Sequence, residues 1–313
     1  MRIGLHANQL DLRGNSTVIY DYAHALKHIF GYEPHIISSR KLSTHPMERF
    51  SEFRYSLYES PDELPYMVEK EKLDVLYMTK AGNKDNITPN NCKTAIHCVF
   101  DMREPHGTVY AGVSEWLAKY YKQTLWVPHI INVPKVHETL HEHFGIPKAD
   151  FVVGRLGGYD QFDIDFVKKS LVDTVNKRSD FWAIFLNTKP FVDHPRIKFV
   201  GFNPDPSYKW KFINTCDAMI HARSDGETFG LAVAEFSAMN KPVLTFDAPY
   251  WWYMRSHIDI LGKKAILYKN YEEISAYLTQ IDKNYVKDVD WDCYSARFSP
   301  SNVINKFKEV FLQ

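Results

Sequence analysis

Short apolar runs alternate with helical patterns along the first half of the chain. The apolar runs have strand length and predict β-strands at 2–7, 35–38, 74–79, 94–100 and 126–128. Helical patterns predict helices over 16–30, 114–121 and 136–144, the first capped by Ser16 or Asn15. The stretch 40–65 shows neither pattern, and we expect an irregular, mobile loop over a site there.

The alternation starts again after 145–150, whose Gly, Pro and Asp residues suit a linker. Further strands are expected at 151–156, 181–186, 198–200, 218–221 and 242–246. Further helices are expected at 162–177, 207–214, 227–239, 272–281 and 301–311, the last of them amphipathic.

This order of elements indicates an α/β fold with parallel sheets. We expect a Rossmann-like domain at 1–148, a second at 149–295, and a C-terminal helix at 296–313 that packs back on the first domain. Ligands of open α/β sheets bind beyond the carboxyl ends of the strands, so a cleft between the two domains should hold the site. The loops that matter are then 10–16, 101–108, 156–163, 202–207 and 223–229.

Composition removes several classes of function. Lys and Arg total 38 and Asp and Glu total 38, so the formal net charge is zero, unlike the basic surface of a nucleic-acid binder. No apolar run approaches the roughly 20 residues that span a bilayer, and the N-terminus lacks a signal-peptide pattern. The scattered cysteines suit reduced thiols, so we expect a cytoplasmic protein. Aromatic and lysine side chains at 116–122 allow at most weak peripheral contact with a membrane.

The most informative segment runs from Ser224 to Glu235. Glu227 and Glu235 lie eight positions apart, which on a helix is roughly 12 Å and too far for both to act on one bond. The N–H groups around 228–231 would open the helix between them and favour an anion. The order carboxylate, anion seat, carboxylate suits the sugar, diphosphate and ribose of one extended ligand. An ordinary amphipathic helix with an acidic cap is the alternative.

Three landmarks together resemble a GT-B fold retaining glycosyltransferase of the large family 4 type. Glu227-Thr228-Phe229-Gly230 through Glu235 is similar to that family's block of two glutamates separated by seven residues. Val153-Gly154-Arg155-Leu156 resembles the strand end that opens its donor domain, and 200–219 resembles the stretch before the glutamate block. The resemblance implies hexosyl transfer with retention, from a UDP- or GDP-linked sugar to a glycan or lipid-linked acceptor. It implies no metal and no cofactor beyond the donor.

The resemblance also implies site roles. Glu227 would act at the transferred sugar, Arg155 would pair with the diphosphate, and Glu235 would bind the ribose. The remaining donor-binding positions that we expect are Gly14, Gly157, Gly158, Phe202, Asn203, Thr228, Phe229, Gly230 and Leu231. The first domain would bind the acceptor, with Asp101 and His106 as catalytic candidates on the loop 101–108.

One departure from the family pattern concerns the diphosphate. The family usually places a lysine a few residues after the arginine, whereas here Gly157 and Gly158 follow without one. Their backbone N–H groups could approach the phosphate instead, or another part of the chain could supply the cation.

Two motifs indicate other functions. His137-Glu138-Thr139-Leu140-His141 matches the His-Glu-x-x-His of zinc proteases, with a solvated surface helix as the alternative. Asp163-Ile164-Asp165 matches the Asp-x-Asp of metal-dependent GT-A transferases, although Asp163 could simply cap the helix that follows. A sugar-nucleotide epimerase or hydrolase of GT-B shape, or a non-catalytic binder of sugar nucleotides, would share the expected architecture.

Overall fold

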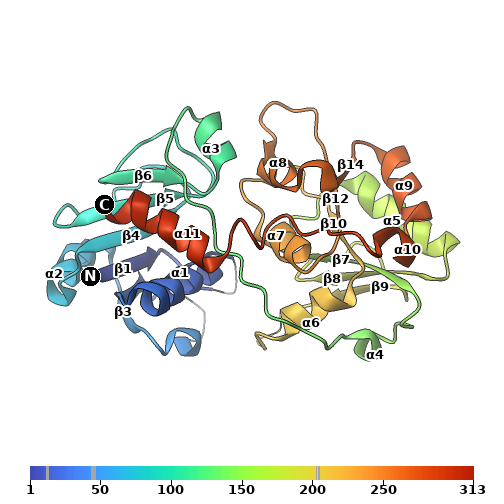
Figure 1. Cartoon of the computed structure of the whole chain (residues 1–313), viewed down its shortest axis with the longest axis horizontal. Coiled ribbons are helices and arrows are strands. Elements are labelled where there is room, and N and C mark those ends of the chain that lie inside the picture. The colour runs from blue at the N-terminus through green and yellow to red at the C-terminus, as the bar shows by residue number, and fades with distance from the viewer. Residues whose placement is uncertain (12–13, 44–46, 202, 204) are drawn as a thin grey trace. The chain divides into compact units, whose positions relative to one another are not determined.

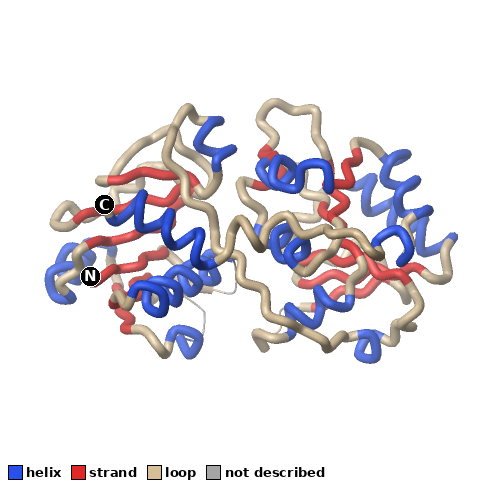
Figure 2. Tube along the Cα trace, in the orientation of Figure 1, coloured by secondary structure: helices blue, strands red, loops and turns tan. Residues whose placement is uncertain are grey.

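The computed structural model describes residues 1–11, 14–43, 47–201, 203 and 205–313. The chain divides into two compact units. Unit 1 comprises 1–130 and 298–313, and unit 2 comprises 131–297. Figure 2 shows that each unit contains strands flanked by helices. Among the described residues, no helix is both long enough and apolar enough to cross a bilayer.

Unit 1 is built on a parallel sheet that has six strands among the described residues, in the order β3-β2-β1-β4-β5-β6 (Figure 1). Along the chain its strands are β1 (Arg2–Ala7), β2 (Glu33–Ser39), β3 (Arg54–Tyr58), β4 (Val75–Lys80), β5 (Lys93–Cys98) and β6 (Val109–Gly112). The central strands β1, β4 and β5 are almost fully buried, as continuous apolar runs in a parallel sheet covered on both faces should be.

Helices cover this sheet and include the C-terminal one. They are α1 (Gly14–Phe30), α2 (Leu64–Glu71), α3 (Glu115–Tyr120) and α11 (Pro300–Phe307), with a π-helical turn η4 (Lys308–Leu312) after it. The fully buried Phe307 lies 4.9 Å from the ring of Tyr22 on α1 and 5.0 Å from that of Tyr77 on β4. The final segment therefore contributes core to unit 1, as the predicted fold class requires.

The prediction of an irregular loop at 40–65 is wrong where the structure describes it. The segment forms η1 (Met47–Phe50), strand β3 and η2 (Pro61–Glu63), where Ser60 and Glu63 make a capping box. Strand β3 pairs in parallel with β2, from His35 opposite Arg54 to Ser39 opposite Tyr58. Its outer residues are exposed because it is an edge strand, so the sequence lacks the apolar run that marks the central strands.

Unit 2 has the same topology. The described strands of its parallel sheet follow the order β14-β12-β10-β7-β8-β9. They are β7 (Phe151–Leu156), β8 (Phe181–Leu186), β9 (Ile197–Val200), β10 (Ala218–His221), β12 (Val243–Phe246) and β14 (Ala265–Tyr268). In both units the chain starts in the middle of the sheet, runs to one edge, and returns to the middle before running to the other edge. This is the strand order of a Rossmann fold.

The helices of unit 2 differ from expectation at 136–140. They are α4 (His141–Phe144), α5 (Asp165–Lys177), α6 (Tyr208–Thr215), α7 (Leu231–Ala238), α8 (Ser256–Leu261), α9 (Tyr271–Gln280) and α10 (Lys283–Val286), with η3 (Gly262–Lys264) after α8. Residues 136–140 are not helical, because their backbone carbonyls and amides bond to α6: Asn214 donates to Glu138 O at 3.0 Å and Leu140 N donates to Thr215 at 2.7 Å. Unit 2 begins at Ile131, whereas we expected the first domain to extend to 148.

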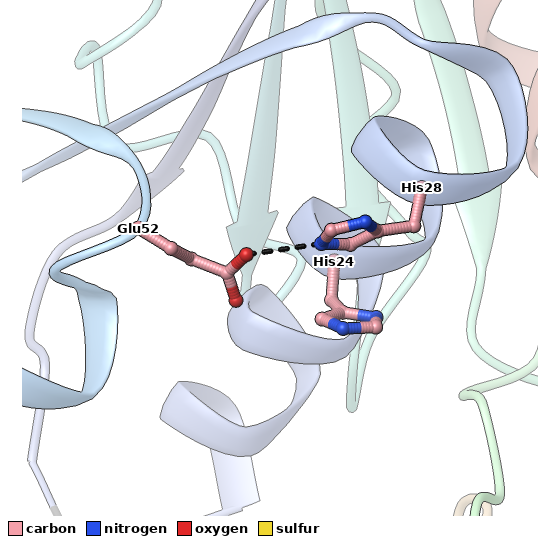
Figure 3. Close-up of side chains that lie close together, drawn as sticks. All are labelled: His24, His28 and Glu52. Carbon is pink, nitrogen blue, oxygen red and sulfur yellow. Dashed lines mark hydrogen bonds and ion pairs between the residues drawn. The ribbon is translucent and has the colours of Figure 1, made fainter.

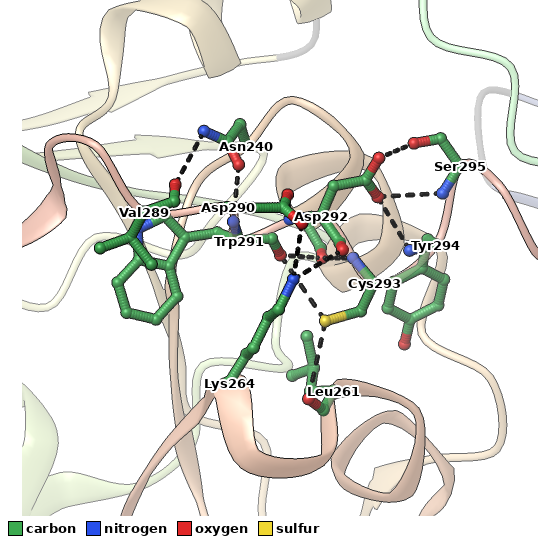
Figure 4. A network of polar contacts seen from close by, with 11 residues as sticks. Asn240, Leu261, Lys264, Val289, Asp290, Trp291, Asp292, Cys293, Tyr294 and Ser295 are labelled. Atoms are coloured by element: carbon green, nitrogen blue, oxygen red, sulfur yellow. Dashed lines mark hydrogen bonds and ion pairs between the residues drawn. The ribbon is translucent and has the colours of Figure 1, made fainter.

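Polar contacts fix the segment after α10 to the rest of unit 2 (Figure 4). Asn240 donates to Val289 O at 3.2 Å and accepts from Trp291 N at 2.6 Å. Lys264 bonds Asp290 at 3.0 Å. Tyr294, which follows in this segment, is thereby held with its ring 5.8 Å from that of Phe229, the residue before the N-terminal cap of α7.

Candidate functional site

The site of unit 2 arises where the strand order reverses, between β7 and β10. These two strands pair through Ala218 opposite Val153 and Met219 opposite Gly154. Arg155 lies near the carboxyl end of β7 and His221 at the carboxyl end of β10. A crevice opens at this point in Rossmann folds because the connections leave in opposite directions, and ligands bind there. Gly157 and Gly158 follow β7, and the residues from Glu227 to Glu235 follow β10.

Gly154 lets the β7 backbone and Cys216 approach each other closely. A Cβ at Gly154 would lie 2.1 Å from Cys216 Sγ. Cys216 is the C-terminal cap of α6, so the end of this helix packs directly on β7. Glycine is therefore required immediately before Arg155 for a packing reason, independent of any ligand.

Arg155 is 5% exposed, and neighbouring loop groups bind its guanidinium. It donates to the hydroxyl of Thr188, to Asn187 O at 3.4 Å and to Gly158 O at 2.9 Å. Burial lowers its pKa to about 10, and the negative charge of Glu227 opposes that effect. Arg155 is thus a buried, charged group that holds the loop after β7 in place.

The two glycines after β7 wrap around this guanidinium. A Cβ at Gly157 would lie 2.9 Å from Arg155 Nη2, and one at Gly158 would lie 2.5 Å from Gln161 Oε1. Asn187 donates to Gly157 O at 2.8 Å. Gly157 packs against Arg155 and Gly158 packs against Gln161, while their expected approach to a phosphate stays a prediction.

Glu227 lies in a two-residue strand and not in a helix. Strand β11 (Gly226–Glu227) pairs in parallel with β13 (Met254–Arg255), and α7 begins only at Leu231. The predicted helix over 227–239 therefore starts four residues too early, and the spacing of roughly 12 Å does not apply. Gly226 has φ of 72°, and a Cβ there would lie 2.1 Å from Met254 O, so the pairing requires glycine.

Two basic side chains hold the Glu227 carboxylate. Arg223 Nη1 donates to one oxygen at 2.9 Å, and His221 Nε2 lies 3.4 Å from the other. Burial by itself raises the pKa of Glu227, but the contacts with His221 and Arg223 outweigh it and lower the pKa to about 2. Glu227 is therefore ionised throughout the physiological range and fixed in orientation.

Buried polar groups extend this arrangement into the core. His221 Nδ1 lies 2.8 Å from Thr245 Oγ1 on β12, and that hydroxyl lies 2.9 Å from His257 Nε2 on α8. Burial lowers the pKa of His257 well below its usual range, so this imidazole is neutral at physiological pH. The chain from His257 through Thr245 and His221 fixes the position of Glu227.

Helix α7 begins beside this carboxylate with an uncapped N-terminus. Gly230 occupies the N-cap position with φ of 82°, no side chain caps the helix, and its first turn contains no acidic residue. Thr228 and Phe229 are buried just before it, while Leu231 is half-buried. The N–H groups of a first helical turn have no acceptor within the helix, so they present a partial positive charge.

Glu235 lies one turn further along α7 and is nearly buried. Its carboxylate accepts from Lys209 Nζ of α6 at 2.5 Å, with side chains 9% and 29% exposed. The structure therefore joins the second glutamate of the block to a cation from a helix 26 positions earlier in the chain.

The remaining predicted donor-binding residues are Phe202, Asn203 and Gly14. Phe202 is outside the described residues. Asn203 accepts from Asp205 N at 2.9 Å and forms a turn before α6. Gly14 is the first residue of α1 in unit 1. The backbone N–H of Asp11, earlier in the chain, donates to Ser16 Oγ at 2.8 Å.

Asp101 and His106 share the loop between β5 and β6 but serve different contacts. Asp101 accepts from Arg103 N at 2.8 Å and Nε at 2.7 Å, and these bonds lower its pKa. His106 Nδ1 lies 2.7 Å from Glu104 O, and its ring is 5.4 Å from that of Tyr110. The structure gives both residues a part in loop architecture, and a catalytic role for either stays a prediction.

The structure does not assemble the two rival metal motifs. Helix α4 begins at His141, so His137 and Glu138 lie in the non-helical segment before it and not on a zinc-protease helix. Asp163 accepts from Ser224 N at 2.8 Å and Oγ at 2.7 Å, whereas Asp165 is exposed and bonds Lys168 at 2.8 Å. Asp163 is not the cap of α5 either, because Ile164 holds that position without a side-chain bond.

Sequence reasoning missed Arg223, His221 and Lys209. Arg223 had only a weak signal, because it lies on the loop 223–229 that was expected to matter, and the i,i+4 rule for helices does not apply outside a helix. His221 and Lys209 had none that a single sequence reveals, because their contacts depend on how strands and helices pack in three dimensions.

Comparisons with known proteins give a match in structure alone. Neither known protein families nor curated proteins match the sequence. A glycosyltransferase from Rickettsia africae superposes with a TM-score of 0.74, 14% identity, and coverage of 99% of this chain and 97% of that one. HepE from Anabaena, solved in complex with UDP-glucose, superposes with a TM-score of 0.72 and 13% identity, and the match covers 99% of this chain and 98% of that one. Sucrose-phosphate synthase from Thermosynechococcus elongatus superposes with a TM-score of 0.66 and 12% identity, and the match covers 99% of this chain and 94% of that one.

These similarities cover almost the whole of each chain and establish the fold. The chain has the GT-B fold, with two parallel Rossmann-like sheets, as the sequence predicted. Metal-dependent transfer on a GT-A fold is therefore excluded as an architecture for this chain.

Proposed function

We propose that the protein is a retaining glycosyltransferase of the family 4 type that uses a nucleotide diphosphate sugar. The observation that carries this proposal is the arrangement at the carboxyl edge of the unit 2 sheet. An ionised Glu227 lies before the uncapped N-terminus of α7, and the buried Glu235 follows one turn into the helix. HepE, which has this fold, was crystallised with UDP-glucose, and that supports a nucleotide-sugar donor here.

In this proposal the diphosphate binds at the N-terminus of α7. The N–H groups of 230–232 donate to its oxygens, and the helix dipole favours its charge. Arg223 supplies the cation that the missing lysine would have given. Its side chain is 11% exposed, and its Nε is buried without a hydrogen-bond partner among the described residues, so a phosphate oxygen would satisfy this donor. Arg155 adds positive potential from behind the loop.

Glu235 binds the ribose and Glu227 faces the transferred sugar. Lys209 occupies one oxygen of Glu235, and the other can accept from a ribose hydroxyl. Glu227 is held by Arg223 and His221 in one orientation, which suits hydrogen bonding to sugar hydroxyls as charge develops at the anomeric carbon.

Transfer then proceeds on one face of the sugar. The bond from the anomeric carbon to the diphosphate breaks, the acceptor oxygen bonds to that carbon from the same side, and the leaving phosphate takes the acceptor proton. Unit 1 supplies the acceptor site, with Asp101 and His106 as candidates. No step in this scheme requires a metal ion, and the acceptor is a glycan or a lipid-linked sugar.

A thermal-shift screen of UDP- and GDP-sugars tests the donor assignment. At 100 times its Kd a donor stabilises the protein by about 2.7 kcal/mol, which raises the melting temperature of a unit of this size by about 5–10 °C. Nucleotide release is then measured with and without a pool of glycan and lipid-linked acceptors. Release that depends on the acceptor supports transfer, while release without acceptor indicates a hydrolase. The absence of any stabilising nucleotide sugar would overturn the proposal.

A further inference from the structure

Three side chains that commonly bind metal ions lie together on the surface of unit 1. His24 and His28 are one turn apart on α1, so their rings project from the same face of the helix. Glu52 reaches them from the turn between η1 and β3 (Figure 3). One ligand atom from each residue lies within 4.8 Å of the other two. Among the described residues this is the only group of three His, Cys, Asp or Glu that meets this criterion.

The spacing suits a tetrahedral ion. With metal–ligand bonds of about 2.0–2.2 Å, neighbouring ligand atoms around zinc are roughly 3.3 Å apart. His28 Nε2 already lies 3.0 Å from Glu52 Oε2, and the His24 and His28 rings have centroids 4.2 Å apart. All three residues are exposed, so rotation of His24 can close the remaining gap of at most about 1.5 Å.

The ligand set also matches zinc chemically. Two imidazoles and a carboxylate form the set of several zinc enzymes, and exposure leaves a further position to water. A zinc ion would replace the contact between His28 and Glu52 with bonds to both.

We propose that His24, His28 and Glu52 form a binding site for a divalent transition-metal ion of the zinc class. The ion joins helix α1 to the turn that leads into edge strand β3, and thereby ties the edge of the unit 1 sheet to the helix that covers it. This site is separate from the glutamate block of unit 2 and does not depend on the proposed transfer reaction.

The charge of Lys27 allows a further test of zinc affinity at this site. Its ammonium lies 3.5 Å from Glu52 Oε2 and also donates to Glu52 O at 2.8 Å. A cation beside the carboxylate opposes a dication at the same oxygen. Replacing Lys27 with Met removes that repulsion and should tighten zinc binding several-fold, an effect that no merely structural role of this cluster would produce.

The experiment is calorimetric titration of ZnCl₂ into the untagged 313-residue chain. Wild type should bind one ion, and His24→Ala, His28→Ala and Glu52→Gln should each weaken binding at least tenfold. His137→Ala is the matched control, because His137 is exposed and belongs to the rival His-Glu-x-x-His sequence. It should bind zinc like wild type. Zinc should also raise the melting temperature of wild type and not of His24→Ala.

Folding of each variant is verified by its circular dichroism without zinc, which exposed positions should leave unchanged. The proposal is overturned if wild type binds no zinc, if His24→Ala binds it as well as wild type does, or if binding is lost only in His137→Ala.

Discussion

The replacement of Glu227 by Gln tests whether the buried charge cluster holds this residue as the structure shows. The carboxylate is 22% exposed, accepts from Arg223 and lies beside His221. Its pKa falls from 4.5 to about 2 on folding. That difference corresponds to about 3 kcal/mol of folding free energy at neutral pH, which the neutral amide does not provide.

The sign of the pH dependence follows from the lowered pKa. Above pH 4.5 the carboxylate is ionised in both folded and unfolded chains, and its full contribution to stability is present. As pH falls toward 2, the unfolded chain takes up the proton first, and the contribution is lost. The difference in stability between wild type and the variant should therefore shrink from about 3 kcal/mol at pH 7 to about 1.5 kcal/mol at pH 3.

Urea unfolding followed by tryptophan fluorescence measures this difference. Five of the seven tryptophans, at 182, 210, 251, 252 and 291, belong to unit 2, so the signal reports mainly on the unit that contains Glu227. Asp165→Asn is the control, since this exposed acid should have no detectable effect. Two results would refute the charge cluster. One is equal stability of wild type and Glu227→Gln at pH 7, and the other is a stability difference that stays the same as the pH falls from 7 to 3.

Three further predictions concern the backbone, the core and metal dependence. Gly226→Ala should displace β11 from Met254 and abolish nucleotide-sugar binding in calorimetric titration. Gly201→Ala, where a Cβ meets none of the described residues within 4 Å, should bind the nucleotide sugar normally. Phe307→Ala should destabilise unit 1 by about 3–5 kcal/mol in urea unfolding, because its ring is fully buried, and a loss below 1 kcal/mol would contradict that packing. Removal of metal ions with EDTA should leave donor turnover unchanged, and inactivation that zinc reverses would argue against the metal-independent scheme.

The sequence predicted the fold where burial leaves a simple pattern. Strands β7 and β10 are covered on both faces, so their apolar runs are visible without any knowledge of neighbours. Edge strand β3 and residues 136–140 were mispredicted because their conformations depend on partners: β2 for the strand, and Asn214 and Thr215 for the segment.

The sequence predicted several residues of the candidate site, but it did not predict the side chains that contact them. Arg155 lies near the carboxyl end of β7, Glu227 lies in β11 and Glu235 lies in α7, and their donor-binding roles stay predictions. Their partners could not be found from sequence spacing, because Lys209 reaches Glu235 from another helix and Thr245 reaches His221 from the neighbouring strand. The start of α7 at Leu231 was also missed, since the pairing of Gly226 with Met254 keeps Glu227 extended.

Calorimetric titration of a nucleotide-sugar donor into wild type and Glu235→Gln tests whether the carboxyl edge of the unit 2 sheet binds the donor. The donor is the UDP- or GDP-sugar that gives the largest thermal shift. Saturable binding to wild type, at least tenfold weaker in Glu235→Gln and unchanged in Asp165→Asn, is the predicted result. Equal affinity of wild type and Glu235→Gln for this donor would contradict a donor site at the carboxyl edge of the unit 2 sheet.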